Sequence, residues 1–333
     1  MRRMGGGPVR VALVGCGTVA LRQHLPGFRA LGRDRVDVVA FASRSRVSAQ
    51  AAAKAWGGGA AMERWEEAIA RPDVDAVDIC TPNRLHAEIA VAAARAGKHV
   101  LVEKPMALTL EEADAMIEAA AEAGVVLATA HVGRYLPAVR AAAGAVAAGR
   151  VGRVHTVEVH YAHGGPRTWA PEADWFFDPG EAGGGALIDL GVHGMDTVRA
   201  VSGQGIAEVA CRTGEVREGV EYDANALCRL EGGGTAWVKA SWAAPYGSDR
   251  HLAVWGEGGQ LVVRGGRLTL RRADGGEEAL GAEEGASLYG DFVRACRGEA
   301  SPVPTGEDGR RALSAVLAGY ESARRGGAPV RVR

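Results

Sequence analysis

The sequence predicts an α/β fold with a doubly wound parallel sheet, followed by an α+β region whose strands are mostly antiparallel. Strand-like and helix-like segments alternate over residues 9–130, which is typical of a parallel sheet with helices on both faces. Shorter alternating runs then recur from residue 151 to about residue 264, as in an antiparallel meander. The length of 333 residues fits about two domains, and we place them at residues 8–130 and 131–333.

Composition excludes several classes of protein. Lys plus Arg number 39 and Asp plus Glu number 40, for a net charge of -1, so nothing favours nucleic acid or an anionic membrane as partner. No apolar run approaches the ~18 residues of a membrane span, and no apolar segment of the signal-peptide type follows Arg2 and Arg3. Five cysteines without CxxC spacing favour free thiols in a reducing compartment. We therefore expect a cytoplasmic protein.

The first strand, at 9–14, runs into a glycine-rich turn that opens a helix reaching about residue 31. The turn has the G-x-G-x-x-A pattern of a dinucleotide site and consists of Gly15, Cys16, Gly17, Thr18, Val19 and Ala20. Gly15 permits the tight turn, Gly17 lets the backbone approach a pyrophosphate, and Ala20 lets the helix pack closely on the strand. The alternative is a tight turn that binds nothing.

The second strand, at 36–42, ends before Ser43 and Arg44. NAD-preferring sites usually carry an acid there for the ribose hydroxyl, whereas a hydroxyl and a guanidinium suit a 2′-phosphate. We therefore predict NADP, with NAD possible because Arg44 can also stack on adenine. The alternative is that Arg44 is an ordinary surface residue.

The alternation continues to residue 129. We expect helices at 47–56 and 62–70, a third that begins after Thr81 or Asn83 and runs to residue 96, and a fourth at 110–123; strands are expected at 74–80, 99–102 and 125–129. Asn83 or Thr81 is predicted to cap the third of these helices, which carries His86, and Thr109 the fourth.

Glu103 and Lys104 come directly after the strand at 99–102, and Pro105 stiffens the exit. Ligands of open α/β sheets bind just outside the carboxyl ends of the strands. The two charges are therefore predicted to lie at a ligand site, the alternative being a salt bridge at the strand end.

In the second half, Val157, Val159 and Tyr161 should share the buried face of one strand. Trp237 and Trp242 should lie on opposite faces of another, with one in the core and the other exposed. Further strands are expected from about residues 207, 222, 250 and 260, a helix from 305 to about 325, and a last strand at 330–332.

A helix is predicted after three glycines at 183–185. Asp189, His193 and Asp196 are spaced i, i+4 and i+7 and so share one face. A carboxylate beside an imidazole orients the ring and raises its basicity, as acid–base catalysis requires. An ordinary helical pair is one alternative and a metal site another, but no third ligand is evident nearby and we predict no metal.

The chain resembles the glucose–fructose oxidoreductase, inositol dehydrogenase and rhizopine-catabolism (Gfo/Idh/MocA) family. The resemblance rests on the glycine-rich turn, on Cys80-Thr81-Pro82-Asn83 with His86, and on Ala96-Gly97-Lys98-His99-Val100-Leu101-Val102-Glu103-Lys104-Pro105. It implies a Rossmann domain, a C-terminal domain with a large open-faced sheet, a nicotinamide cofactor, and a sugar, inositol or related polyol substrate.

The resemblance also implies roles for individual residues. Lys104, Asp189 and His193 would be catalytic, and with Tyr161 they would contact the substrate. The expected cofactor-binding residues are Gly15, Gly17, Thr18, Val19, Ala20, Ser43, Arg44, Thr81, Pro82, Asn83, His86, Glu103, Lys104, Arg134 and Trp175. Many relatives that use NADP have Arg after that tryptophan; here it is Phe176, which removes one supporting contact.

We therefore predict a dehydrogenase or reductase that moves a hydride between the nicotinamide and a secondary alcohol or ketone. The alternatives are a redox-neutral enzyme with tightly bound NAD and a sensor that binds NAD(P) without turnover. A homodimer or homotetramer formed through the C-terminal sheet is expected.

Overall fold

A computed structural model describes residues 7–244, 249–281 and 285–333 of the chain. It divides into two compact units, Met1–Ala130 with Ala286–Arg310, and His131–Gly285 with Arg311–Arg333. The domains predicted from the sequence are residues 8–130 and 131–333. The segment 286–310, which the sequence assigned to the second domain, groups instead with the first unit.

The first unit contains a six-stranded sheet in which all neighbouring strands are parallel, in the order β3-β2-β1-β4-β5-β6. Its strands are β1 (Val9–Val14), β2 (Val36–Ala42), β3 (Ala60–Met62), β4 (Ala76–Ile79), β5 (His99–Val102) and β6 (Leu127–Thr129). The strand order reverses direction at β1, so the carboxyl ends of β1 and β4 flank the crevice where such sheets bind ligands.

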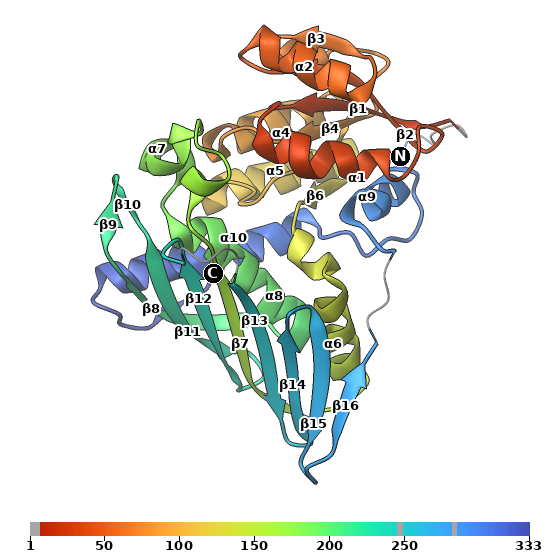
Figure 1. The fold of residues 1–333 in the computed structure, drawn as a ribbon. Coiled ribbons are helices and arrows are strands. Elements are labelled where there is room, and N and C mark those ends of the chain that lie inside the picture. Colours follow the sequence, from red (N-terminus) through yellow and green to blue (C-terminus); the bar gives the residue numbers. More distant parts are fainter. Residues whose placement is uncertain (1–6, 245–248, 282–284) are drawn as a thin grey trace. The chain divides into compact units, whose positions relative to one another are not determined.

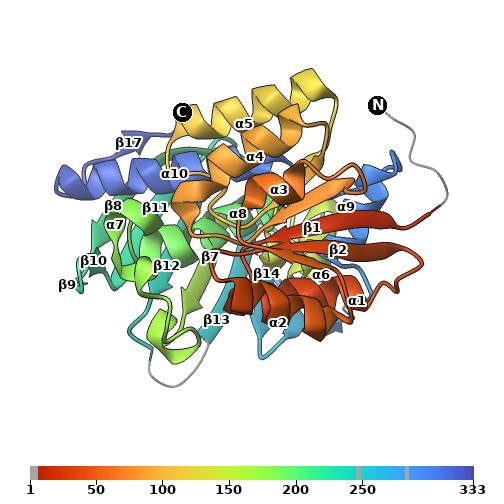
Figure 2. The same ribbon diagram turned by 90° about the horizontal axis from the view of Figure 1, so that it is seen from above.

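Helices cover both faces of this sheet (Figures 1 and 2). They are η1 (Ala20–His24), α1 (Leu25–Arg29), α2 (Arg46–Trp56), α3 (Trp65–Ile69), η2 (Asn83–Leu85), α4 (His86–Arg95), α5 (Leu110–Ala123) and α9 (Leu288–Cys296). The predicted doubly wound sheet is thus confirmed. η1 is a π-helical turn, a rare geometry that recurs at functional sites.

Local sequence explains most of these boundaries. Thr109 caps α5 as predicted: its hydroxyl accepts from the N–H of Glu112, whose carboxylate accepts from the N–H of Thr109 in return. Gly124 ends the helix at φ 64°, where glycine carries no steric penalty.

Two local predictions were wrong. Residues 62–70 were expected to be one helix, but Met62 pairs with Ala42 as the end of β3, and α3 starts only at Trp65. Neither Asn83 nor Thr81 stands at the N-cap of α4: a 3₁₀ turn over Asn83–Leu85 precedes the helix, and Leu85 occupies the N-cap without a side-chain capping bond. At Met62 the pairing with β2 replaced the local helical pattern.

The segment 286–310 returns to the first unit through α9 and an extended stretch. The N–H of Thr129, at the end of β6, donates to the carbonyl of Pro304 at 2.9 Å, and Ala128 bridges Thr305. In α9, the ring of Tyr289 packs edge-on against Phe28 with 5.0 Å between centroids. The chain therefore completes its first unit with residues from its C-terminal part.

The second unit is built on a nine-stranded sheet in the order β16-β15-β14-β13-β7-β12-β11-β8-β17. All neighbouring pairs are antiparallel except β12 with β7, which confirms the predicted mostly antiparallel sheet. Its strands are β7 (Val154–Ala162), β8 (Ile206–Thr213), β11 (Asp223–Leu230), β12 (Thr235–Ser241), β13 (Asp249–Gly256), β14 (Gly259–Arg264), β15 (Arg267–Arg272), β16 (Glu277–Leu280) and β17 (Val330–Arg331); β9 (Val216–Arg217) and β10 (Val220–Glu221) form a separate ribbon.

Helices cover one face of the nine-stranded sheet (Figure 1). The helical segments of this part are η3 (Val132–Tyr135), α6 (Pro137–Ala147), η4 (Pro166–Thr168), η5 (Asp174–Phe177), α7 (Pro179–Ala182), η6 (Leu187–Gly191), α8 (Val192–Ser202) and α10 (Gly306–Arg324). Val157, Val159 and Tyr161 are buried as predicted, and so is Trp242, just beyond β12, whereas Trp237 is 39% exposed. None of the helices in the described ranges is long and apolar enough to cross a membrane.

Candidate active site

The glycine-rich turn after β1 lies against the ends of two neighbouring strands. The N–H of Gly15 donates to the carbonyl of Ala42, the last residue of β2, at 2.8 Å. Gly15 has φ +92°, and a Cβ there would lie 2.5 Å from the carbonyl carbon of Cys80. Only glycine fits between the strands, as the fingerprint requires.

The far side of the same turn is open. A Cβ built on Gly17 meets nothing within 4 Å, so another molecule can approach its backbone closely. The helical turn starts here, because the N–H of Leu21 donates to Gly17 at 3.1 Å. Thr18 and Val19 are half-buried and Ala20 is fully buried against the sheet. The arrangement fits a pyrophosphate at a helix N-terminus.

Polar groups just after β4 also indicate a ligand site. The hydroxyl oxygen of Thr81 is buried and has no hydrogen-bond partner among the described residues, and buried polar groups are normally paired. Pro82 is half-buried and Asn83 is 7% exposed. The residues present therefore fit the nicotinamide dinucleotide that the fingerprint predicts.

Ser43 and Arg44 follow β2, one residue beyond the carbonyl that holds Gly15. The N–H of Ser43 donates to Met62 at 3.1 Å, and the side chain of Arg44 is exposed. Ser45 caps α2, its hydroxyl accepting from the N–H of Ser48. Arg44 thus lies at the edge of the turn, where the adenine ribose of a Rossmann cofactor lies.

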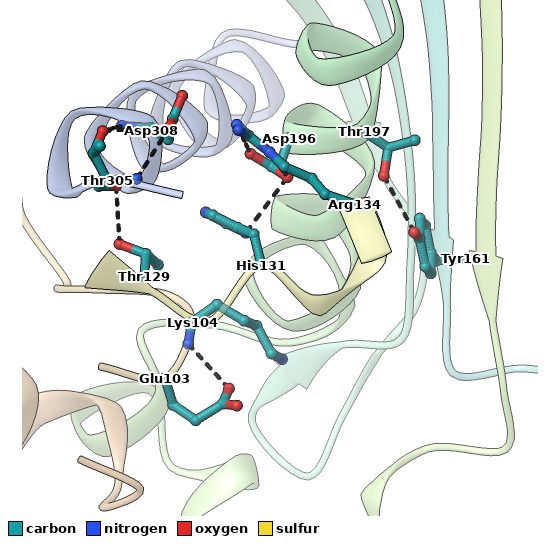
Figure 3. Close-up of polar contacts among 10 residues, drawn as sticks. All are labelled: Glu103, Lys104, Thr129, His131, Arg134, Tyr161, Asp196, Thr197, Thr305 and Asp308. Atoms are coloured by element: carbon teal, nitrogen blue, oxygen red, sulfur yellow. Dashed lines mark hydrogen bonds and ion pairs between the residues drawn. The ribbon is translucent and has the colours of Figure 1, made fainter. Parts of the chain in front are cut away.

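Glu103 and Lys104 directly follow β5 as predicted, and the Glu103 side chain contacts two other groups of the same unit. Its carboxylate accepts from the main-chain N–H of Lys104 at 3.0 Å (Figure 3) and lies 2.9 Å from the Nε2 atom of His24. Burial raises the pKa of Glu103 and is the largest single effect, but the hydrogen bonds and charges of His24 and Lys104 together outweigh it, and the pKa lies below its usual value. The carboxylate is therefore charged.

His86 braces the other side of this segment. Its two ring nitrogens lie 2.8 Å from the carbonyl oxygen of Pro105 and 2.9 Å from that of Thr81. The ring is fully buried, and burial lowers its pKa, so it is neutral. His86 joins the segment after β4 to the segment after β5.

In the second unit, Asp189 lies in the π turn η6 and is 6% exposed. The indole N–H of Trp242 donates to its carboxylate at 2.9 Å, and Nε2 of His163 lies 3.9 Å from the same oxygen. Nδ1 of His163 accepts from the N–H of Gly165 at 2.9 Å, so the proton of a neutral ring is on Nε2, facing Asp189.

His193 lies four residues further on, in the first turn of α8, and is half-buried. Its ring stacks on Tyr161 with 5.5 Å between centroids. The hydroxyl of Tyr161 lies 3.2 Å from that of Thr197, also in α8, and burial raises its pKa. Tyr161 therefore supports the face of the imidazole while its hydroxyl is engaged with Thr197.

Asp196, the third member of the predicted helical face, binds a neighbouring arginine. Arg134 in η3 forms two hydrogen bonds to its carboxylate, at 2.8 and 2.6 Å (Figure 3), and Nδ1 of His131 lies 3.9 Å away. This bidentate pair fixes the start of the second unit on α8.

Trp175 is half-buried in η5. Its ring stacks on Phe176 with 3.8 Å between centroids, and Phe176 packs edge-on against Trp169 at 5.3 Å. Phe176, which stands where many NADP-using relatives have Arg, thus orients the ring of Trp175.

The predicted residues therefore form two groups. The glycine-rich turn, Ser43, Arg44, the segment after β4 and Glu103-Lys104 belong to the first unit; Asp189, His193, Tyr161, Arg134 and Trp175 belong to the second. His24, Asp78, His163 and the contact of Trp242 with Asp189 were not predicted from the sequence. A histidine in the helix of the fingerprint was the one available signal for His24.

Both halves of the chain match one family of proteins. Residues 9–131 match its N-terminal domain, described as "Oxidoreductase family, NAD-binding Rossmann fold", and residues 139–262 match the "GFO/IDH/MocA C-terminal domain". The chain belongs to the Gfo/Idh/MocA family. It is accordingly an NAD(P)-dependent oxidoreductase.

Several family members are similar over three quarters of this chain or more. A 1,5-anhydro-D-fructose reductase of Ensifer adhaerens is 37% identical over 95% of this chain and 97% of its own. A myo-inositol 2-dehydrogenase of Thermotoga maritima is 29% identical over 76% of this chain and 78% of its own. A levoglucosan dehydrogenase solved in complex with NADH and levoglucosan has a TM-score of 0.87 and 27% identity, over 98% of this chain and 99% of that one.

Proposed function

We propose that the substrate of this oxidoreductase is a sugar, an inositol or a related polyol, oxidised or formed at a secondary alcohol. The names of the similar family members give 1,5-anhydro-D-fructose, myo-inositol and levoglucosan as the compounds on which they act. The observation that carries the proposal is the placement of Lys104. It follows β5, and β5 is the neighbour of β4 in the sheet. Just after β4, Thr81 lies beside the glycine-rich turn and its hydroxyl has no hydrogen-bond partner among the described residues.

In this proposal Lys104 and His193 have different roles at the reacting oxygen of the substrate. When bound, the nicotinamide supplies the acceptor or donor of the hydride. The Lys104 ammonium donates a hydrogen bond to the reacting oxygen and stabilises the negative charge that develops on it. A ring nitrogen of His193 takes the hydroxyl proton during oxidation and returns it during reduction.

Asp189 has a supporting role in the same reaction. Its carboxylate, held by Trp242 and faced by His163, would bind a neighbouring hydroxyl of the substrate or orient His193. Tyr161 keeps the imidazole in place through the stacked ring. The buried position of the carboxylate makes each of its hydrogen bonds stronger than it would be in water.

The proposed cofactor is NADP, with NAD also accepted. Gly15, Gly17, Thr18, Val19 and Ala20 would hold the pyrophosphate, and Ser43 with Arg44 the 2′-phosphate. Thr81, Pro82 and Asn83 would line the nicotinamide end, and Trp175 and Arg134 are further proposed cofactor contacts. Because their side chains are engaged internally, His86 and Glu103 would act by shaping the backbone around this ligand.

We also propose a cytoplasmic homodimer or homotetramer. The five cysteines are all free thiols, which suits a reducing compartment. Leu227 and Trp237 are cross-strand neighbours and are 57% and 39% exposed, so part of the sheet face is apolar and suits a second copy of the chain.

A panel assay tests the substrate class. Sugars, anhydrosugars and inositols are incubated with NADP or with NAD, and the absorbance of the reduced nicotinamide is followed. We expect turnover with at least one cyclic polyol and a higher kcat/KM with NADP. Cofactor that copurifies and is never released in reduced form would instead indicate a redox-neutral enzyme, and binding without turnover a sensor.

A further inference from the structure

A chain of buried polar groups lies behind the strand end that carries Lys104. Nδ1 of His24 lies 2.9 Å from the carboxylate of Asp78 in β4, and Nε2 lies 2.9 Å from that of Glu103. His24 and Asp78 are fully buried, and the Glu103 side chain is 12% exposed. The other carboxylate oxygen of Glu103 accepts from the N–H of Lys104. The residues therefore connect in the order Asp78, His24, Glu103, Lys104.

Both contacts of the ring need a proton. A nitrogen–oxygen distance of 2.9 Å is that of a hydrogen bond, and a carboxylate can only accept. The three groups thus share two protons, and the simplest arrangement is an imidazolium between two carboxylates. Burial by itself lowers the pKa of His24 and is the largest single effect, but the charge and hydrogen bond of Asp78, together with Cys80 and Tyr289, outweigh it, and the pKa is raised well above its usual value.

The backbone is shaped to bring His24 to this place. His24 ends the π turn Ala20–His24, directly after the glycine-rich turn, and π turns interrupt helices mostly where a function needs them. The ring of Tyr289 packs edge-on against His24 with 5.3 Å between centroids, and a Cβ on Gly27 would lie 2.1 Å from that tyrosine ring. Tyr289, which is far from His24 in the sequence, thus covers the His24 ring, and Gly27 leaves the space that the tyrosine ring needs.

We propose that the His24–Asp78 pair is a positioning device for the proposed reaction. It holds the Glu103 carboxylate against the N–H of Lys104 and so fixes the backbone from which the Lys104 ammonium reaches the substrate. His24 touches neither substrate nor cofactor; it acts through Glu103. The inference rests on the proposed function for its effect on turnover, but not for its effect on the backbone.

A metal ion would be another use of this cluster, since His24, Asp78 and Cys80 have ligand atoms within 4.8 Å of one another. Bonds of about 2.0–2.1 Å to a tetrahedral zinc would place nitrogen and oxygen ligands about 3.3 Å apart. The observed 2.9 Å between His24 and Asp78 is instead a hydrogen-bond distance. The geometry thus favours the hydrogen-bonded chain.

The first test is His24→Gln, because a glutamine amide cannot span both carboxylates. Hydrogen–deuterium exchange of the peptide containing Glu103 and Lys104 is measured on the folded protein, with kcat, the sugar KM and the Kd of NADP. We expect exchange at the Lys104 amide to be about tenfold faster. The kcat should fall about 10- to 100-fold, with KM and Kd changing less than about threefold, since a small misplacement of a catalytic group costs this much.

Two matched controls separate positioning from stability. His99→Gln changes a histidine at the start of β5 that is 7% exposed and accepts from the N–H of Val126. Tyr289→Phe keeps the ring against His24 and removes a hydroxyl that has no hydrogen-bond partner among the described residues. Both should leave kcat and the Lys104 exchange at wild-type values. Losses in His99→Gln as large as those in His24→Gln would overturn the proposal.

Asp78→Asn is the second test and decides the matter if His24→Gln does not fold. It removes the strongest of the groups that raise the pKa of His24, which also faces Cys80, Glu103 and Tyr289. The ring should then lose its proton at a lower pH and donate more weakly to Glu103. The ratio of wild-type to variant kcat should grow between about pH 6 and about pH 9; a ratio that stays constant contradicts the proposal.

The exchange measurement keeps this inference separate from the proposed function. If no sugar or polyol is turned over, the proposed function fails, and faster exchange at Lys104 in both variants still supports the positioning role. If turnover is found but exchange and kcat in His24→Gln equal those of the controls, the proposed function stands and the positioning role is wrong.

Discussion

At the residue scale, Lys104 is the side chain on which the proposed chemistry depends most. Lys104→Ala should lower kcat by about 10²-fold or more, because the donor to the developing oxyanion is lost, and should leave the Kd of the cofactor nearly unchanged. Steady-state kinetics and a fluorescence titration with NADPH measure the two effects.

A lysine at the opposite end of β5 provides the control for this substitution. Lys98 lies just before β5, at its other end, and its ammonium donates to the carbonyls of Arg71 and Val74 at 2.9 and 2.7 Å. Lys98→Ala should cost stability and leave kcat unchanged. Near-wild-type turnover in Lys104→Ala would remove Lys104 from the mechanism.

Cofactor choice is also decided by single residues, Ser43 and Arg44. A charge-assisted hydrogen bond to the 2′-phosphate is worth roughly 1.5–3 kcal/mol, which corresponds to a preference for NADP of about ten- to a hundredfold. Ser43→Asp combined with Arg44→Ile should reverse the ratio of kcat/KM values, chiefly through KM, since the ribose is remote from the hydride.

Arg46, also exposed and two residues along, is the matched control for Arg44. Arg46→Ala should leave the preference unchanged, whereas Arg44→Ala should weaken use of NADP more than of NAD. An equal loss with both cofactors would mean that Arg44 only stacks on the adenine.

At this scale the sequence predicts residues that stand in motifs but gives no sign of pairs that form between distant segments. Lys104, Asp189 and His193 follow recognisable patterns. His24 and Asp78 are separated by 54 residues, and Trp242 and Asp189 by 53, so no local spacing announces either pair. Only the pairing of β4 with β1 and the path of β12 bring them together.

At the element scale, Glu221 determines how the helix carrying Asp189 and His193 begins. Its buried carboxylate accepts from the N–H groups of Gly185 and Leu187 at 3.0 and 2.9 Å and from the hydroxyl of Tyr320 at 2.8 Å. Glu221→Gln should cost about 1.5–3 kcal/mol of unfolding free energy, the value of hydrogen bonds to a charged group. It should also lower kcat, because both side chains are carried on this helix.

The exposed cap of α5 is the comparison for this prediction. Thr109→Ala should cost about 1 kcal/mol and leave kcat unchanged. Urea unfolding gives the two free energies. A Glu221→Gln variant as active and as stable as Thr109→Ala would show that the cap does not position the site.

Most elements were predictable because their signals are local. Thr109 with Glu112 and Gly124 fixes both ends of α5, and short apolar runs such as 99–102 are typical of buried strands in a parallel sheet. The exceptions depend on tertiary contacts. Met62 joins β3 because Ala42 offers a partner, and the π turns at Ala20–His24 and Leu187–Gly191 have no signature in a helical pattern.

At the scale of the whole molecule, the exposed sheet face around Leu227 and Trp237 should join two copies of the chain. Trp237→Arg places a charge on that face and should shift the dimer or tetramer towards monomer. Sedimentation velocity at micromolar concentration measures the shift. Val216→Arg, at a side chain 64% exposed in the separate ribbon, should have no effect, and a wild-type monomer would contradict the assembly.

The path of the chain through its two units was the part of the architecture least accessible from sequence. Nothing in the composition of residues 286–310 distinguishes them from the second half. Their place follows from long-range contacts, such as Tyr289 against Phe28 and Pro304 with Thr129. Family resemblance supplied the two domains, but not this return of the chain.

The central claim is that a hydride passes between a secondary carbinol carbon of a sugar or polyol and the nicotinamide. The most direct test uses the best substrate of the panel, deuterated at its carbinol carbons, with mass spectrometry of the cofactor after turnover. The account predicts that the reduced nicotinamide carries the deuterium and that Lys104→Ala and His193→Ala both slow its appearance. Reduced cofactor without deuterium, or a transfer rate indifferent to both substitutions, would contradict it.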